Sequence, residues 1–213
     1  MPRIADPTLA DRVFTALSRQ IEAGTLLAGQ RLRQDEIATE FGASHVPVRE
    51  AFRRLEAEGL VESLPRRGVR VALADRAALA EAIEMRAALE ALALRHAAEA
   101  YPPGHLNALA EADHICAQAT SPVEWEAANQ TFHALLLQGC PMPRLMQTIE
   151  RLQLSASRMT RQLGLTRRLG LPREDRDHRA ILSALQSREI ELAAQTLARH
   201  IRRSLATRAG VTG

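Results

Sequence analysis

The stretch from residue 43 to residue 61, ASHVPVREAFRRLEAEGLV, constrains the fold more than any other part of the chain. Ser44 is a residue type that caps helix N-termini, and Gly59 is placed to end a helix. Apolar residues repeat at i, i+4 and i+7 between them, which predicts one buried face made of Val48, Phe52 and Leu55. The stretch therefore predicts a helix from about residue 46 to residue 58, with arginines on its polar side.

The neighbouring segments predict two helices before this one and a hairpin after it. Apolar residues at helical spacing follow Thr8 and stop at Gly24, and a shorter helix is expected from about Gln34 to Phe41. Two short alternating segments, LVESLP and GVRVA, are joined by RRG and are typical of a β-hairpin. Three helices with a glycine break before the third, followed by a hairpin, form the winged helix-turn-helix pattern.

Arginines of the third helix and of the hairpin are candidates for DNA contacts. Arg49 and Arg53 would face outward one turn apart, and an outward arginine near the start of such a helix can bind O6 and N7 of guanine. Ser44 either caps the helix or turns its hydroxyl to a phosphate. Arg66 and Arg67, at the hairpin tip, are placed for a phosphate or the minor groove.

The overall charge does not decide whether these arginines bind DNA. The formal net charge is only +3, although the pI is about 9.6, so DNA binding must be argued from where the arginines lie. The alternative is a solvated amphipathic helix whose arginines pair with Glu50 and Glu56. The pattern by itself leaves both interpretations open.

Residues 75–213 have a different character, because they are rich in Ala and Leu and read as helical throughout. Breaks are expected at YPPG, TSP, GCPMP and LGLTRRLGLP, and about six helices are predicted. No apolar run is long enough to span a membrane, and the two cysteines, Cys116 and Cys140, lack metal-site spacing. We therefore expect a mainly α, cytoplasmic protein without membrane contact, with a DNA-binding domain at 1–74 and an all-helical domain at 75–213.

Three histidines lie on three separate predicted helices: His133, His178 and His200. Each shares its helical face with apolar residues, so each imidazole is expected to point toward the interior of the helical domain. A single such residue is usually a hydrogen-bonded core histidine, but three on facing helices can hold a divalent ion. Asn129 lies one turn before His133 and can add an oxygen ligand. A helical metalloenzyme, with Glu90 as its acid or base, is one alternative to a regulatory ion site.

The segment RLRQDEIATEFGASHVPVREAFRRLEAEGLVESLPRRGVRV resembles the DNA-binding domain of the GntR family of bacterial transcription regulators. The resemblance rests on PVREA..RLEAEGLV and on the P-R-x-G-x-x-V that follows. It implies that Ser44, His45, Arg49 and Gly68 lie where family members contact DNA. Many members have arginine at the position of His45, so a neutral histidine weakens or changes that contact.

The second half resembles the helical effector domain of the FadR subfamily, called FCD, in N-x-x-F-H, D-H-R-A-I-L and A-x-x-x-L-x-x-H-I. The resemblance implies a divalent ion, zinc or nickel, held by an aspartate and three histidines, which match His133, His178 and His200. It also implies a small carboxylate bound against the ion. Asn129 occupies the aspartate position; its amide oxygen is a weaker ligand, and the site is one charge more positive, which favours an anionic effector.

Arg86 lies in EMRAALEALA, which resembles the R-x-x-x-E of the first FCD helix. It would bind an effector carboxylate, or else form an i, i+4 ion pair with Glu90. The leading hypothesis is a repressor that acts as a homodimer on a two-fold DNA operator and responds to a small organic acid. A regulator that senses the metal ion itself is the nearest alternative.

Overall fold

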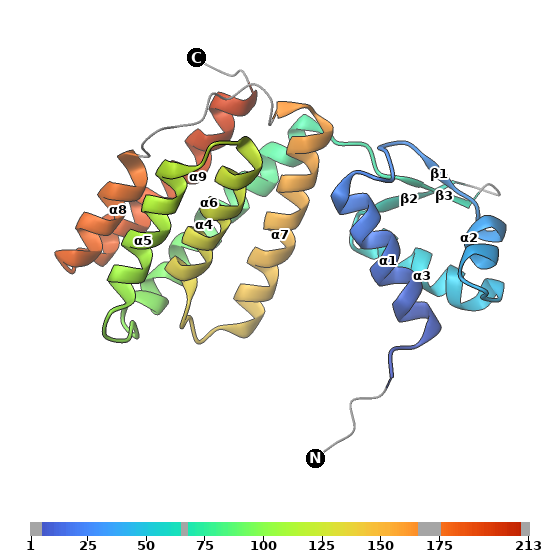
Figure 1. Cartoon of the computed structure of the whole chain (residues 1–213), viewed down its shortest axis with the longest axis horizontal. Coiled ribbons are helices and arrows are strands. Elements are labelled where there is room, and N and C mark those ends of the chain that lie inside the picture. The colour runs from blue at the N-terminus through green and yellow to red at the C-terminus, as the bar shows by residue number, and fades with distance from the viewer. Residues whose placement is uncertain (1–5, 65–67, 166–175, 210–213) are drawn as a thin grey trace. The chain divides into compact units, whose positions relative to one another are not determined.

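The first seventy-four residues contain three helices and a small sheet, as the sequence predicted. In the computed structural model, which describes residues 6–64, 68–165 and 176–209, clustering of contacts separates Met1–Ala74 from Asp75–Gly213. The helices of the first unit are α1 (Leu9–Ala23), α2 (Gln34–Glu40) and α3 (His45–Ala57) (Figure 1). Its strands are β1 (Arg31–Leu32), β2 (Val61–Leu64) and β3 (Gly68–Val71).

The sheet of the first unit has the order β1-β3-β2 and is antiparallel throughout. The predicted hairpin is β2 and β3, and it is confirmed. β1 was not predicted, because two residues are too few to show alternation. Gly68 begins β3 with a φ of 82°, and a Cβ there would lie 2.8 Å from the carbonyl oxygen of Leu32. Glycine is therefore required where β3 passes β1.

Local signals explain where the helices of the first unit begin and which faces they bury. Thr8 and Asp11 form a capping box at the start of α1, in which the Asp11 amide donates to Thr8 Oγ1 at 3.1 Å and the Thr8 amide to Asp11 Oδ2 at 2.9 Å. The predicted inward residues of α3 are all buried in one core with α1 and the sheet: Val48, Phe52 and Leu55.

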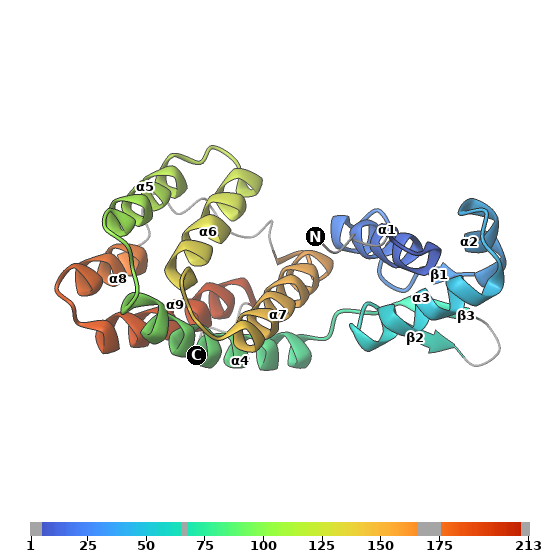
Figure 2. The same cartoon turned by 90° about the horizontal axis from the view of Figure 1, so that it is seen from below.

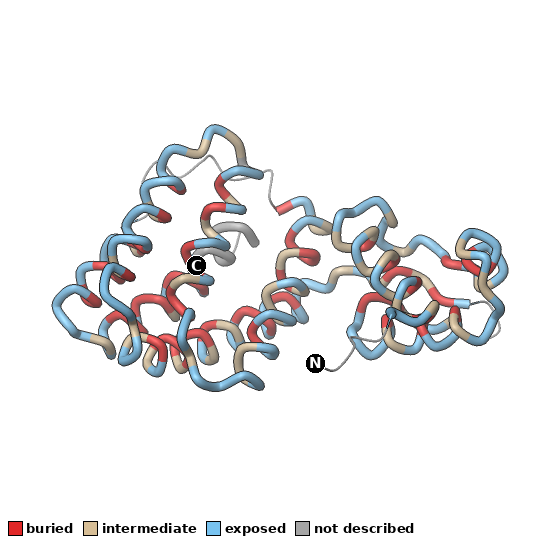
Figure 3. Tube along the Cα trace, turned by 60° about the horizontal axis from the view of Figure 1, so that its bottom comes forward, coloured by how far each residue is buried: buried red, intermediate tan, exposed pale blue. Residues whose placement is uncertain are grey.

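The second unit is a bundle of helices, and its described part contains six, in line with the expected number. They are α4 (Arg76–Ala98), α5 (His105–Gln118), α6 (Pro122–Leu137), α7 (Pro143–Gln162), α8 (Arg176–Gln186) and α9 (Ile190–Ala209). α4 packs against α6, α7 and α9, and α5 packs against α6 and α8 (Figure 2). Buried positions lie on the sides of the helices that face their neighbours (Figure 3). The mainly helical fold class is confirmed.

The sequence predicts His178 and His200 on separate helices, but the position of the boundary between these helices was not predicted. α8 and α9 are separated by a short turn that contains neither glycine nor proline, and Arg188 there adopts a φ of 60°. None of the described helices is sufficiently long and apolar to cross a membrane.

Both ends of α6 are fixed by side chains, and this helix carries two of the predicted ligands. Ser121 caps its start by accepting a hydrogen bond from the Glu124 amide at 3.2 Å. At its other end, the Tyr101 hydroxyl donates to the carbonyl of Leu136, and His105 Nε2 donates to the carbonyl of Leu135 at 2.9 Å. The Leu136 carbonyl thus gains a side-chain donor at the end of the helix, and the Leu135 carbonyl gains one in addition to the Gln138 amide.

Candidate DNA-reading helix and buried histidine site

The outward face of α3 carries the two arginines that the sequence singled out. Arg49 and Arg53 are exposed, on the side of the helix opposite its buried residues. Across the described ranges, neither guanidinium has an ion pair or hydrogen bond with another side chain. Glu56 instead accepts a hydrogen bond from the Ser63 amide at 3.0 Å. The alternative interpretation, in which these arginines pair with Glu50 and Glu56, is therefore not observed among the described residues.

Arg54, in contrast, has a structural role. Its Nη1 lies 2.7 Å from Asp11 Oδ1, and its guanidinium lies 4.3 Å from the centre of the Phe14 ring. The hydrogen bond from the Thr8 hydroxyl, together with Arg54, lowers the pKa of Asp11 to about 2. Arg54 thus joins α3 to α1 and is not part of the outward face.

The first turn of α3 leaves polar groups exposed. Ser44 is the N-cap residue by its backbone, but its side chain makes no capping hydrogen bond. Of its two predicted roles, capping α3 and binding a phosphate, the first is therefore not observed. His45 Nδ1 lies 3.6 Å from Asp35 Oδ1, and its carbonyl accepts a hydrogen bond from Gln34 Nε2 at 2.9 Å. The contact with Asp35 was not predicted, because it joins two helices across a turn.

Sequence reasoning also missed Val46. This side chain is 64% exposed in the first turn of α3, on the same outward side as Arg49. The signal in the sequence is that this β-branched apolar residue lies outside the i, i+4, i+7 repeat of Val48, Phe52 and Leu55. Of the predicted wing residues, Gly68 begins β3, while Arg66 and Arg67 lie outside the described residues.

In the second unit, the structure brings the three predicted histidines together. His133 comes from α6, His178 from α8 and His200 from α9, and all three are buried. One ring nitrogen from each lies within 4.8 Å of the other two. The Phe132 ring stacks on His178, with centroids 3.9 Å apart, and fixes the plane of that imidazole. Three imidazoles at this spacing are a donor set typical of zinc or nickel.

Each of these imidazoles has its Nδ1 directed at a carboxylate. His133 Nδ1 lies 3.1 Å from Glu90 Oε2, and His178 Nδ1 lies 3.0 Å from Asp113 Oδ1. His200 Nδ1 lies 3.7 Å from Asp177 Oδ2. An ionised carboxylate can only accept a hydrogen bond, so the proton of His133 and that of His178 belong on Nδ1. In these two rings, the nitrogen left to act as a metal ligand is then Nε2. The contact of His200 with Asp177, at 3.7 Å, is too long for a hydrogen bond.

Glu90 is the most deeply buried of these acids, with no exposed surface. Its Oε1 accepts hydrogen bonds from Arg86 Nε at 2.9 Å and from Gln153 Nε2 at 3.1 Å. Burial by itself would raise the pKa of Glu90, but the charge of Arg86 and the hydrogen bonds from His133 and Gln153 outweigh it and lower the pKa to about 2. Glu90 is therefore ionised throughout the physiological pH range.

Arg86 forms the i, i+4 pair with Glu90 that was one of its two predicted roles. The pair is not on the surface, since the Arg86 side chain is only 16% exposed. Only its Nε takes part in that hydrogen bond, and within the described chain the structure gives its two terminal nitrogens no partner. The pair with Glu90 and a second contact to an effector are thus compatible.

The side-chain oxygen of Asn129 indicates whether the site can hold a metal ion. Its Oδ1 is buried and has no hydrogen-bond partner among the described residues. A buried carbonyl-type oxygen without a donor is costly, and a cation would satisfy it. Asn129 lies one turn before His133 on α6. The predicted ligands therefore fit a divalent ion, which when bound would act as a Lewis acid for an anionic group.

Comparison with protein families decides what kind of protein this is. The model of the FCD domain matches residues 81–203, and that of the bacterial regulatory proteins, gntR family, matches residues 9–71. The chain belongs to the GntR family and carries an FCD domain. It is therefore a DNA-binding transcription regulator of a family that consists of regulators and not of enzymes, as the sequence predicted.

Individual relatives of this GntR-family chain agree. A Paenarthrobacter nicotinovorans protein described as a "Probable D-xylose utilization operon transcriptional repressor" is 32% identical, over 93% of this chain and 88% of its own. The "HTH-type transcriptional repressor RspR" of Escherichia coli K12 is 26% identical, over 89% and 84%.

Solved structures of similar proteins include E. coli McbR/YncC, which is 26% identical, with a TM-score of 0.74 over 96% of this chain and 98% of that one. A GntR-family regulator of Pseudomonas syringae is 28% identical, with a TM-score of 0.55 over 96% and 89%.

Proposed function

We propose that this regulator is a repressor that acts in the cytoplasm as a homodimer, with α3 of each protomer in one half-site of a two-fold operator. The observation that carries the proposal is the outward face of α3, where Arg49 and Arg53 are exposed and make no ion pair within the described residues. Two protomers related by a two-fold axis present two such helices to successive major-groove segments. Two relatives described as repressors support the direction of regulation.

Contacts with the operator follow from the chemistry of the first turns of α3. Arg49 binds O6 and N7 of a guanine, and the Val46 side chain beside it is suited to the methyl group of a thymine. The Ser44 hydroxyl, which makes no capping bond, binds a phosphate. His45, Arg53 and the wing residues Arg66, Arg67 and Gly68 are the remaining proposed contacts.

The proposed effector is a small organic acid that binds at a zinc or nickel ion in the second unit. His133, His178, His200 and Asn129 hold the ion in this proposal. All four ligands are uncharged when they bind, so an anionic effector would be the first charged group in direct contact with the ion. The free terminal nitrogens of Arg86 are suited to the effector carboxylate.

Replacing Arg49 tests the DNA-binding part of the proposal. Operator DNA is first selected from a random duplex library with the full chain, and affinities are then measured by fluorescence anisotropy at several salt concentrations. Arg49→Ala is expected to cost roughly 1–3 kcal/mol at each half-site and to relax the preference for guanine.

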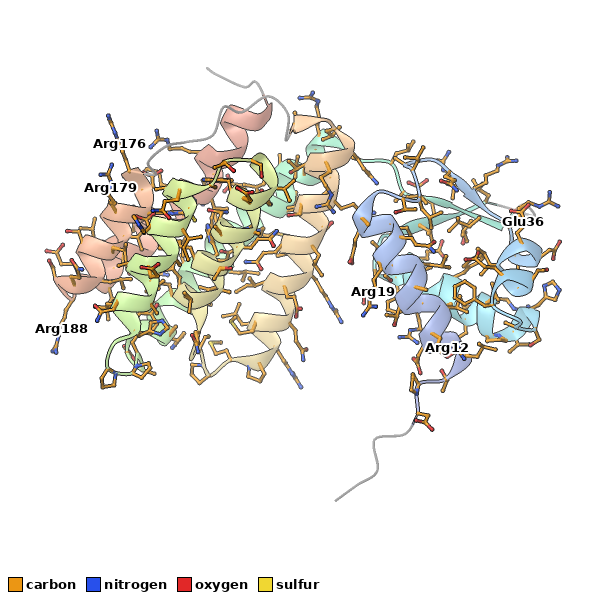
Figure 4. The ribbon with its side chains drawn as sticks, in the orientation of Figure 1. Arg12, Arg19, Glu36, Arg176, Arg179 and Arg188 are labelled. Carbon is orange, nitrogen blue, oxygen red and sulfur yellow. The ribbon has the colours of Figure 1, made fainter. Side chains whose placement is uncertain are left out.

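The matched control is Arg19→Ala, which removes the same charge from an exposed position on α1 (Figure 4). It is expected to keep the preference for guanine. Sequence-specific binding that survives Arg49→Ala unchanged would refute the assignment of α3 as the reading helix.

A metal-sensing regulator is the second candidate, since the same histidines could make the ion the signal. Zinc or nickel is titrated into the metal-free protein–operator complex, with and without a panel of small organic acids. A change in operator affinity that needs both the ion and an acid supports the proposed effector. The same change with the ion alone supports metal sensing.

A further inference from the structure

Three carboxylates from three different helices lie beside the histidine cluster, and none of them is among the proposed ligands of the ion. Glu90 comes from α4, Asp113 from α5 and Asp177 from α8, and each faces the Nδ1 of a different imidazole. The residues of each pair are far apart in sequence or lie on different helices, so the arrangement is produced by the packing of the bundle.

A carboxylate at Nδ1 changes what an imidazole offers at its other nitrogen. The carboxylate holds the proton on Nδ1, fixes the orientation of the ring and makes Nε2 a more basic ligand. In the pair of Asp113 and His178 the two atoms are 3.0 Å apart, and the imidazole is fully buried. The ring therefore has little freedom to exchange its tautomer or to turn.

This chain has a particular need for negative charge near the cluster. Asn129 is uncharged, so a divalent ion held by it and the three histidines would be bound by neutral ligands alone. Glu90, Asp113 and Asp177 place three carboxylates one imidazole away from the same point. Their charges act at a longer range than that of a direct ligand, but in a largely buried region where screening is weak.

We propose that Glu90 and Asp113 are positioning residues that fix His133 and His178 as Nδ1–H tautomers. Together with Asp177, which lies beside His200, they supply the anionic charge that Asn129 does not. The inference rests on the metal site of the proposed function. Part of the metal affinity of this chain then comes from residues outside the direct ligands, and Nε2 is the ligand atom of His133 and His178.

Asp113 offers the cleanest test of the three acids. Its side chain is 18% exposed and is hydrogen-bonded to His178. Its removal therefore leaves no buried arginine without a counter-ion, whereas the removal of Glu90 would leave Arg86 without one. Asp113→Asn keeps the size of the side chain and removes the charge. The amide can also donate to Nδ1, which favours the tautomer with its proton on Nε2 and blocks that nitrogen.

The control is Glu111→Gln, which removes the same charge from an exposed position on the same helix, two residues away. Affinities of the full chain for Zn²⁺ and Co²⁺ are measured by competition with a chromophoric chelator. Asp113→Asn is expected to lower both affinities by roughly 10- to 100-fold, as outer-shell changes do, while Glu111→Gln leaves them unchanged. Asp113→Glu, which restores the carboxylate, is expected to recover part of the loss.

A second measurement does not depend on any variant. Nitrogen-15 NMR of the histidine rings in the metal-free wild-type protein should show His133 and His178 with the proton on Nδ1. A proton on Nε2 in these rings would overturn the inference directly. In Asp113→Asn, the shift of His178 toward the other tautomer separates a positioning role from a loss of helix packing.

The outcomes also separate this inference from the proposed function. If the wild-type chain binds the ions and Asp113→Asn has the same affinity for them as Glu111→Gln, the carboxylates have no positioning role. The proposed metal site is then unaffected. If the wild-type chain binds neither ion, the inference and the metal site both fail. DNA binding is then still decided by the Arg49 measurement.

Discussion

At the scale of single residues, Glu90 shows how a charge is kept deep in a helical bundle. Removing a carboxylate from water is costly unless other groups replace the lost hydration. Glu90 receives hydrogen bonds from Arg86 and Gln153 at one oxygen and a contact from His133 Nδ1 at the other. It therefore connects the residue proposed to bind an effector with a residue proposed to bind the ion.

Replacing Glu90 should destabilise the second unit. Glu90→Gln leaves the mostly buried guanidinium of Arg86 without its counter-ion, and breaking a buried pair in this way costs about 3–5 kcal/mol. Urea unfolding can be followed by the fluorescence of Trp125, which is buried in α6 and is the only tryptophan of the chain. Glu81→Gln, at an exposed position of the same helix, is the control and should change the unfolding free energy little.

The effect of Glu90→Gln should also depend on pH. The folded state lowers the pKa of Glu90 from its ordinary 4.5 to about 2, so its ionised form stabilises the fold fully above pH 4.5. This contribution is lost as the pH falls from there toward 2. The difference in unfolding free energy between wild type and Glu90→Gln should therefore narrow over that window. A constant difference would show that the charge of Glu90 does not stabilise the fold.

At the scale of elements, α1 holds α3, the proposed DNA-reading helix, in place through the first turn of α1. The capping box of Thr8 and Asp11 fixes the start of α1, and Asp11 also pairs with Arg54 of α3 at 2.7 Å. The same carboxylate thus caps the start of α1 and joins α1 to α3. The position of α3 depends on this contact as well as on the apolar core.

Removing the cap should loosen α1. Thr8→Ala deletes the acceptor for the Asp11 amide, and such changes cost about 1 kcal/mol. Amide hydrogen exchange in α1 of the full chain should accelerate by roughly 5-fold, the factor that corresponds to 1 kcal/mol. Thr15→Ala, at an exposed position inside the same helix, should not accelerate exchange, because alanine is the better helix former.

At the scale of the whole molecule, α3, the proposed DNA-reading helix, and the histidine site belong to different units. A ligand in one unit can change the DNA affinity of the other only through a difference in its affinity for two states of the protein. Because such coupling is reciprocal, operator DNA must change the affinity for the ligand by the same factor.

This reciprocity can be measured with zinc and a chelator. If Zn²⁺ binds the folded second unit as proposed, it should raise the urea concentration at which Trp125 becomes exposed. The factor by which saturating Zn²⁺ changes operator affinity should equal the factor by which operator changes the affinity for Zn²⁺. If Zn²⁺ stabilises the protein but neither factor differs from one, the ion has a structural role and is not coupled to DNA binding.

Local patterns in the sequence determined the helices, the outward arginines of α3 and the inward histidines. Capping residues such as Thr8 and Ser121, and apolar repeats such as Val48, Phe52 and Leu55, act within one or two turns, so they can be read without a fold. The resemblance in motifs then identified the two domain types, and the family comparison confirmed them.

Tertiary packing alone decided which groups meet across helices. Asp113 and His178 are 65 residues apart, and Glu90 and His133 are 43 apart, yet each pair lies within hydrogen-bonding distance. The partners of Arg54 and His45, and the strand β1, likewise come from segments that the chain brings together. No local periodicity encodes such contacts, because they depend on the relative positions of whole elements, which are set by burying the apolar faces of those elements together.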